Sequence, residues 1–265
     1  MSDAIRTTLD DYLLALDHIE AAEFDLALPI LGRLVAFEPA NDNFFRSWII
    51  VHLGLQRFRK AIELADAGIA AGRQPRAAFD LWKAIAYQAL EEPEQAETAA
   101  RAAIAAGPQH GAATLFLSAL LLGQGRAQEA FELCLQAAEA DPEDEALALY
   151  LITFAKNVEL PERVVEFARG YLKRFDKNAE VLSMLGSAYV DLNDLRRADR
   201  AFRDAAALEP HVAGHHINIV MTAYTRGDEL AAEAYLGKLA SRDEELAGRV
   251  AEAVDVLFDE LEEKG

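Results

Sequence analysis

The sequence predicts an all-α fold, a solenoid in which pairs of helices repeat along the chain. Three observations support this fold. Alanine, replaced once by valine, recurs at intervals of 34 or 35 residues over most of the 265-residue chain. Proline is limited to 8 residues and alanine is plentiful, a composition that favours helix. The last 23 residues place apolar side chains at helical spacing, which predicts one further helix at the end.

The clearest repeat lies towards the end of the chain. Gly186 is expected to let two helices approach closely, with Tyr189 filling the space beside it. Ala198 should lie where the helices cross, and Pro210 should end the second helix, because proline cannot continue a helix comfortably. The unit reads Leu182-x2-Leu185-Gly186-x2-Tyr189, then Ala198-x3-Phe202, then Pro210.

This unit matches the tetratricopeptide pattern W-x2-L-G-x2-Y, A-x3-F, P, with Leu182 in place of the leading Trp. The chain resembles the tetratricopeptide-repeat (TPR) family over nearly its whole length. The resemblance implies a right-handed superhelical solenoid of about seven TPR helix-turn-helix repeats with a C-terminal capping helix. The key alanine recurs at Ala27, Ala61, Ala96, Ala130, Ala198 and Ala232, with Val164 in the remaining slot. The repeats are expected over 8–41, 42–76, 77–110, 111–144, 145–178, 179–212 and 213–242, within a repeat region of residues 1–242.

Some repeats depart from the pattern. The slot of Gly186 holds Ile49, Ile152 or Val220 in repeats two, five and seven, where we expect the two helices to sit slightly further apart. Repeat two contains one extra residue, in the segment 72–75. Prolines at the ends of repeats recur at Pro39, Pro108, Pro142 and Pro210.

Residues 243–265 are predicted to form an acidic capping helix, because the last repeat would otherwise expose its stacking face. A detachable amphipathic ligand for another protein is the alternative. The acidic polar face argues against a membrane-surface role, which favours Lys and Arg. The apolar positions are Leu246, Val250, Val254, Leu257 and Leu261.

A second stripe, at repeat positions 2, 5, 9 and 12 of each first helix, lines the concave face in the TPR family. Its residues in repeats one to four are unusually apolar, which predicts a groove for an apolar peptide or amphipathic helix of a partner. Burial by the N-terminal helix, by tight coiling or by dimerisation is the alternative. The groove residues expected to bind are Tyr12, Leu16, Ile19, Asn43, Arg46, Ile50, Leu53, Leu81, Ile85, Gln88, Leu115 and Leu122, with Leu149 from repeat five.

Arg196, Arg200 and Arg203 share one face of a second helix, on an otherwise acidic chain. Their spacing indicates either a salt-bridged outer surface or a convex docking site for an acidic partner. His211 and His215 have metal-binding spacing, but nearby ligands do not complete a set. Cys134 falls at a core position and is expected to be buried and inert. We therefore expect no catalytic residue, no metal and no cofactor.

The composition narrows the classes of function. A net charge of −19 disfavours nucleic acid, and no apolar run approaches the roughly 20 residues that span a bilayer. The single cysteine and the lack of a signal-like N-terminus predict a cytoplasmic location. The leading hypothesis is a non-enzymatic adaptor or scaffold that binds a protein or peptide. The alternatives are a TPR chaperone for an aggregation-prone or secreted client, and a solenoid that self-assembles into homo-oligomers.

Overall fold

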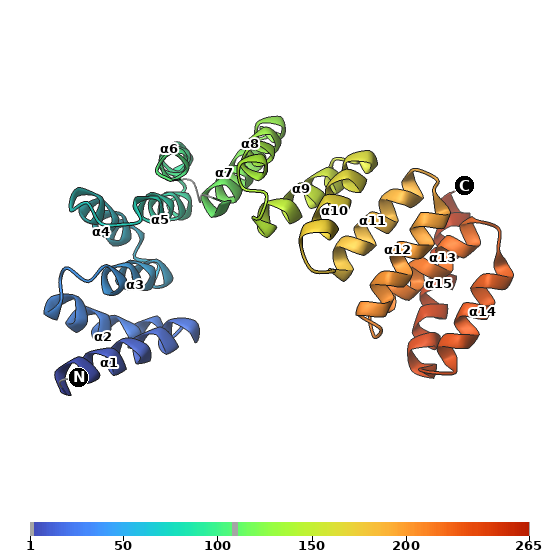
Figure 1. Cartoon of the computed structure of the whole chain (residues 1–265), viewed down its shortest axis with the longest axis horizontal. Helices are drawn as coiled ribbons and strands as arrows, with labels where there is room; N and C mark the ends of the chain where they lie inside the picture. Colours follow the sequence, from blue (N-terminus) through green and yellow to red (C-terminus); the bar gives the residue numbers. More distant parts are fainter. Residues whose placement is uncertain (1–2, 108–110, 265) are drawn as a thin grey trace. The chain divides into compact units, whose positions relative to one another are not determined.

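The computed structural model describes residues 3–107 and 111–264, and the side chains of residues 8–107 and 111–259. Fifteen α-helices and no strand occur in these ranges. Pro108 and the side chain of Leu261 lie outside the described residues. The chain divides into two compact units, residues 1–137 and 138–265. Each unit is a stack of helix pairs (Figure 1).

The first unit begins with a helix at Asp3, ahead of residue 8, where the first repeat was expected. Its helices are α1 (Asp3–Glu20), α2 (Phe24–Phe37), α3 (Asp42–Gly54), α4 (Phe58–Ala70), α5 (Arg76–Ala89), α6 (Pro93–Ala105), α7 (Gly111–Gly123) and most of α8 (Ala127–Ala140). The second unit contains α9 (Glu145–Asn157), α10 (Pro161–Arg174), α11 (Ala179–Asp191), α12 (Leu195–Leu208), α13 (Ala213–Thr225), α14 (Glu229–Ala240) and α15 (Glu244–Lys264).

The turn inside each helix pair has the same backbone form. One residue adopts a left-handed conformation, with φ between 56° and 76°, and the next residue donates its N–H to the carbonyl five positions earlier. Arg57 N–H to His52 O at 2.8 Å is one example, and the pattern is the usual closure of a helix C-terminus. The left-handed residues are Ala22, Gln56, Glu91, Gly125, Glu159, Asn193 and Gly227, which follow one another at intervals of 34 or 35 residues.

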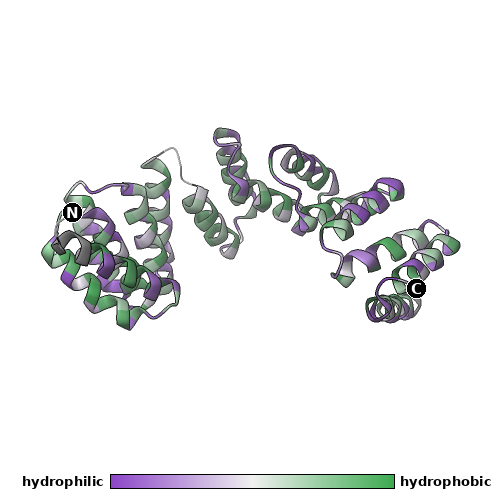
Figure 2. Cartoon of the chain, turned by 60° about the horizontal axis from the view of Figure 1, so that its bottom comes forward, coloured by the Kyte–Doolittle hydropathy of each residue, from purple (hydrophilic) through white to green (hydrophobic). Residues whose placement is uncertain are grey.

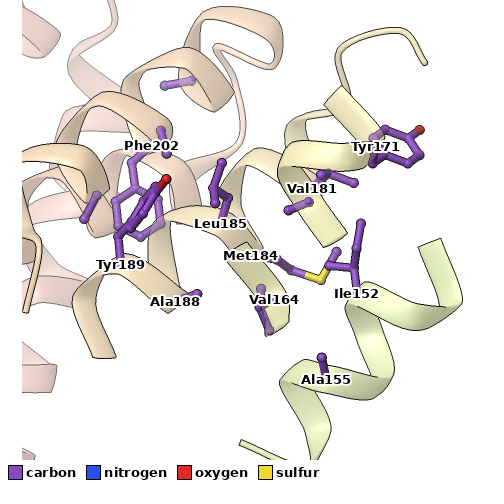
Figure 3. Close-up of a cluster of buried hydrophobic side chains, with 14 of the residues drawn as sticks. Ile152, Ala155, Val164, Tyr171, Val181, Met184, Leu185, Ala188, Tyr189 and Phe202 are labelled. Atoms are coloured by element: carbon purple, nitrogen blue, oxygen red, sulfur yellow. The ribbon is translucent and has the colours of Figure 1, made fainter. Parts of the chain in front are cut away.

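The residues that recur at the helix crossings form the core. All six alanines of that slot are at most 1% exposed, and Val164 is 2% exposed. Most helices carry apolar residues on one side and polar residues on the other (Figure 2), and the apolar side is buried between helices, whereas α7 has no charged residue. In the second unit, Figure 3 shows the ring of Phe202 beside that of Tyr189, and Met184 pointing towards Ile152.

The Gly186 slot holds side chains of different size in different helix pairs. Gly186 and Ala84 occupy it in α11 and α5, which run close to their second helices over a longer stretch of backbone than α3 or α13. In α3 and α13 the slot holds Ile49 and Val220, both 0% exposed. In α9 the slot holds Ile152, yet α9 and α10 pack about as extensively as α1 and α2, whose slot holds Ala15, so a wider separation of the helices in all three repeats stays a prediction.

The extra residue of repeat two lies in a tight connection between α4 and α5. Arg73 in this segment donates to Asp42 Oδ1 at 2.6 Å and also to the carbonyl of Pro39. Its guanidinium stands 4.3 Å from the centre of the Phe45 ring. One side chain therefore ties the end of the second repeat to the start of α3.

The buried side of α6 consists only of alanine, at Ala96, Ala99, Ala100 and Ala103. Alanine has the highest helix propensity but offers only one methyl group to the core. Larger side chains come from α7, whose Leu117 and Leu121 are fully buried in the same cluster.

The last helix, α15, covers the final helix pair. Leu246, Val250 and Val254 are at most 2% exposed and pack into one cluster with residues of α13 and α14. Phe258 packs edge-on against Tyr224, with ring centres 4.9 Å apart, whereas Leu257 is 37% exposed. Phe258, rather than Leu257, thus continues the buried face. No helix in the described ranges is long and apolar enough to cross a membrane.

Candidate ligand-binding surfaces

The predicted groove residues of repeats one to four lie on the first helices of the first unit. Of these, α1, α3 and α5 are neighbours. No predicted groove side chain on α1, α3, α5 or α7 is buried. Leu16, Ile85 and Leu122 are 36–39% exposed. The half-buried members are Tyr12, Ile19, Arg46, Ile50, Leu53, Leu81 and Leu115, and Asn43 and Gln88 are exposed.

Two polar contacts organise the part of this stripe on α1 and α3. The Tyr12 hydroxyl lies 3.1 Å from Ser47 Oγ, and the Tyr12 ring packs on Phe44 with centres 4.8 Å apart. Arg46 donates to the side-chain carbonyl of Asn43. Arg46 forms no ion pair with a described carboxylate, so its charge is available to an acidic group of a ligand.

The corresponding stripe in the second unit is more polar. Leu149 is half-buried and packs against the cluster between α9 and α11. Lys156, Ser187 and Asp191 line a cavity of about 340 Å³ together with the start of α10. These three side chains present a cation, a hydroxyl and a carboxylate, whereas Val164 and Met184 line the same cavity, so its lining is mixed.

Ser183, His215 and Glu209 form a chain of contacts that the sequence did not predict. Ser183 Oγ lies 2.8 Å from His215 Nδ1, and His215 Nε2 lies 3.1 Å from Glu209 Oε2. The order serine, histidine, carboxylate is that of a nucleophilic triad. However, Ser183 lies inside α11, where backbone N–H groups are used in helical hydrogen bonds, so the neighbouring backbone supplies no oxyanion donors. The contacts instead fix the start of α13 against α11.

The other two histidines near this point have different roles. His216 Nε2 lies 2.9 Å from the Pro210 carbonyl, which can only accept, so this nitrogen carries the hydrogen. In the neutral ring, Nδ1 then accepts from the Tyr235 hydroxyl at 2.7 Å. His211 is exposed in the turn before α13. No group of three or more His, Cys, Asp or Glu side chains suited to a metal ion occurs in the described residues.

Cys134 is fully buried on α8, and its Sγ lies 2.9 Å from Ser118 Oγ. Burial raises the pKa of the thiol, and the hydrogen bond opposes that shift only in part. A thiol with a raised pKa and no solvent access is a poor nucleophile.

Arg196, Arg200 and Arg203 of α12 are exposed. Arg203 pairs with Asp199 at 2.8 Å, a contact that raises the pKa of Arg203, and it also stands over the Tyr235 ring. Arg196 and Arg200 form no ion pair with a described carboxylate. The α12 surface is therefore a salt-bridged face that retains unpaired cations.

Comparison with known families agrees with this architecture. A family model described as tetratricopeptide repeat matches residues 81–145 and 183–246, which together are just under half of the chain. The chain is a tetratricopeptide-repeat protein. The matched segments include the groove residues of repeats three and four and the arginines of α12.

Solved structures of TPR proteins share the fold. The C-terminal part of a TPR repeat-containing protein from Cytophaga hutchinsonii is 15% identical, with a TM-score of 0.59 over 79% of this chain and 93% of that chain. A MamA structure is 14% identical, with a TM-score of 0.55 over 65% of this chain and 94% of that chain. MamA from Desulfovibrio magneticus, residues 41 to the end, is 15% identical, with a TM-score of 0.52 over 63% and 97%.

This TPR chain spans 48% of the length of a chain in the APC/C hetero-tetramer Cut9–Hcn1, with 19% identity over 91% of its own length and a TM-score of 0.49. No curated protein matches the sequence. Because these structural relatives are at most 19% identical to this chain, the likeness shows a common fold.

Proposed function

We propose that this protein is an adaptor that holds an apolar segment of a partner protein against the first helices of repeats one to four. The TPR fold serves protein–protein interaction in general. The observation that carries the finer proposal is the accessible apolar stripe, in which Leu16, Ile85 and Leu122 are each more than a third exposed. An apolar row on a solvent-facing surface is typical of a binding site.

The stripe is large enough to supply useful binding energy. Burial of apolar surface stabilises a complex by about 25 cal/mol per Å², so covering the exposed part of one such leucine contributes about 1–2 kcal/mol. Several of these side chains together would offset the cost of ordering a peptide. Arg46 at the edge would orient an acidic group of the same ligand.

The test uses three substitutions at the exposed positions, Leu16→Glu, Ile85→Glu and Leu122→Glu, combined in one variant. These sites are preferable to Leu81 and Leu115, which are half-buried and whose substitution would threaten folding. The matched control changes three exposed leucines elsewhere, Leu192, Leu208 and Leu230, to glutamate. Circular dichroism checks that both variants fold.

Partners captured from the native lysate by wild type are identified and then titrated in purified form. The adaptor proposal expects at least tenfold weaker binding by the groove variant and unchanged binding by the control. Equal binding by all three proteins would show that the stripe is structural. A partner that aggregates on its own and stays soluble at equal stoichiometry with wild type would indicate the chaperone form of this function.

Self-association through the N-terminal end is a second candidate. Leu13, Leu14 and Leu26 on α1 and α2 are 46–53% exposed in the first helix pair. Apolar side chains that no neighbouring repeat covers favour association of solenoids. Sedimentation over a hundredfold concentration range tests self-association, because a mass that stays that of a monomer would exclude it.

A further inference from the structure

The second helices of the second unit carry a basic surface with two cavities. We call the side formed by α10, α12 and α14 the second-helix face. A cavity lies on each side of α12, one towards α14 and one towards α10. Both combine cationic side chains with an apolar lining. This clustering of cations is unusual on a chain whose net charge is −19, because most of its charged side chains are acidic.

The larger cavity, about 540 Å³, lies between α12, α14 and the start of α15. Arg203, Lys238 and Arg242 supply its cations. Arg203 is paired with Asp199, but Lys238 and Arg242 form no ion pair with a described carboxylate. Asp243 is the only carboxylate in the lining, and its Oδ1 already accepts from Leu246 N at 2.9 Å.

Apolar side chains form the rest of this cavity. Ala206, Leu239 and Leu246 are at most 8% exposed, so they form a floor, and the Tyr235 ring forms a wall beneath Arg203. A volume of this size lies within the range of sites that bind organic groups in proteins. The cavity therefore suits a ligand that has both an apolar part and a negative charge.

The smaller cavity, about 350 Å³, lies between α10, α11 and α12. Its cations are Arg169, Arg197 and Arg200, and Leu182 and Leu185 are buried beneath them. Arg197 pairs with Asp194 at 3.3 Å, whereas Arg169 and Arg200 have no ion pair with a described carboxylate. The chemistry of the first cavity is thus repeated on the other side of the same helix.

We propose that the second-helix face binds an acidic segment of a partner protein, with one apolar side chain in each cavity and carboxylates on the unpaired cations. A single small anion would fill only one cavity. The two cavities are separated by α12, and a helix with side chains is about 10 Å across. An extended chain covers that distance in about three residues. The expected motif is two apolar residues three positions apart among acidic residues.

Charge complementarity selects this occupant. Guanidinium and ammonium groups on the rim favour carboxylates, and the exposed setting makes each pair weak and salt-sensitive. Apolar side chains must therefore supply much of the affinity. This face lies in the second unit, whereas the groove proposed above lies in the first unit, so either proposal can fail without the other.

The test is a titration of the full-length protein with a short fluorescein-labelled peptide, in which two leucines stand three residues apart among glutamates. A matched peptide carries alanine at both leucine positions. Lys238→Ala with Arg242→Ala removes the free cations of the larger cavity. Ala207→Trp fills that cavity from an exposed lining position and leaves the cations in place. Lys156→Ala with Arg249→Ala is the control, because both residues are exposed and neither lines the two cavities.

Fluorescence anisotropy is expected to give saturable binding of the leucine peptide to wild type, with a Kd of about 10–100 µM at low salt. Binding should weaken at least tenfold for the alanine peptide, for Lys238→Ala/Arg242→Ala and for Ala207→Trp. The control should change the Kd less than twofold. Circular dichroism and the melting temperature show whether each variant is folded.

Three results would overturn the proposal. Equal binding of the leucine and alanine peptides would show that the face attracts acidic peptides only by non-specific electrostatics and that the cavities bind no apolar side chain. Absence of saturable binding would remove the site. If wild type is a dimer in sedimentation and Lys238→Ala/Arg242→Ala dissociates it, a second copy of this chain occupies the face instead of a different protein.

Discussion

The Phe202 ring lies directly against the backbone of Gly186. A Cβ atom built on Gly186 would stand 2.5 Å from Phe202 Cε1, which is closer than carbon atoms can approach without displacement. The pair belongs to two helices of one repeat, α11 and α12, and both residues are buried. The close packing of this helix pair therefore depends on the missing side chain.

Gly186→Ala should destabilise the protein by about 1–3 kcal/mol, because the added methyl group overpacks the core. Urea unfolding followed by circular dichroism measures the change. Gly170→Ala is the control, since a Cβ there would meet only the flexible end of Arg174 at 3.7 Å. In that helix the substitution should stabilise by about 0.5–1 kcal/mol. Equal effects at both sites would contradict the packing argument.

Glu159→Gly should stabilise the protein by about 1 kcal/mol. Glu159 holds the left-handed turn position at a φ of 56°, which costs an ordinary residue roughly 1–2 kcal/mol and a glycine much less. Gly227→Ala tests the same position in the opposite direction, because Gly227 has a φ of 72°. Thermal unfolding should show a higher midpoint for the first variant and a lower midpoint for the second.

His52 should make stability depend on pH. The side chain is 6% exposed, and neither ring nitrogen has a hydrogen-bond partner. Burial, aided by the charges of Arg57 and Lys60, lowers the pKa of His52 below its ordinary value of 6.5. As the pH falls below about 6.5, His52 becomes protonated in the unfolded chain while it stays neutral in the folded protein. Protonation therefore favours the unfolded chain, and the folded state loses stability.

Urea unfolding of wild type and His52→Leu between pH 7.5 and about pH 5 isolates this contribution, since the other histidines are common to both proteins. Wild type should lose more stability than the variant over that interval. Parallel curves would show that His52 titrates normally in the folded protein.

Glu97 should contribute a modest, salt-sensitive part of the stability. Its carboxylate lies 2.8 Å from Arg126 and 2.7 Å from Arg101, and these hydrogen bonds lower the pKa of Glu97. Because the folded pKa is below the unfolded value, this stability is present above about pH 4.5 and is lost as the pH falls further. Glu97→Gln should cost under about 1 kcal/mol at pH 7 and nothing at low pH. Glu94→Gln, an exposed change on the same helix that breaks no ion pair with a described residue, is the comparison, and an equal loss at pH 7 would contradict a contribution from the Glu97 pairs.

Much of the fold could be predicted from sequence because one slot repeats. The alanines of the helix crossings were expected to be buried, and they are, since a small residue fits where two helices cross. A wider helix separation at Ile49, Ile152 and Val220 was expected from side-chain volume, but α9 and α10 pack extensively around Ile152, so the slot residue alone does not decide the packing. The buried face at the end of α15 was harder to predict. Leu257 and Phe258 are adjacent in the sequence, and the packing of Phe258 against Tyr224 decides which of them continues that face.

The candidate binding surfaces were only partly predictable. The groove stripe follows from position in the repeat, whereas the cavities beside α12 join Arg203 to Lys238 and Arg242 from the next repeat. The sequence suggested Arg203 through its helical spacing, but the partners that complete the cavity are set by the packing of α14 and α15. Ser183 and Glu209 reach His215 from two different elements, which no local pattern signals.

The alanine-only buried side of α6 has a consequence for where the protein opens. Methyl groups remove little surface from water, so detaching this helix exposes less apolar area than detaching α12, which buries Phe202. Backbone amides of α6 should therefore exchange with deuterated solvent through local fluctuations, well before those of α12 do. The same residues give α6 its high helix propensity, so a segment that forms readily is also a segment that leaves its neighbours easily.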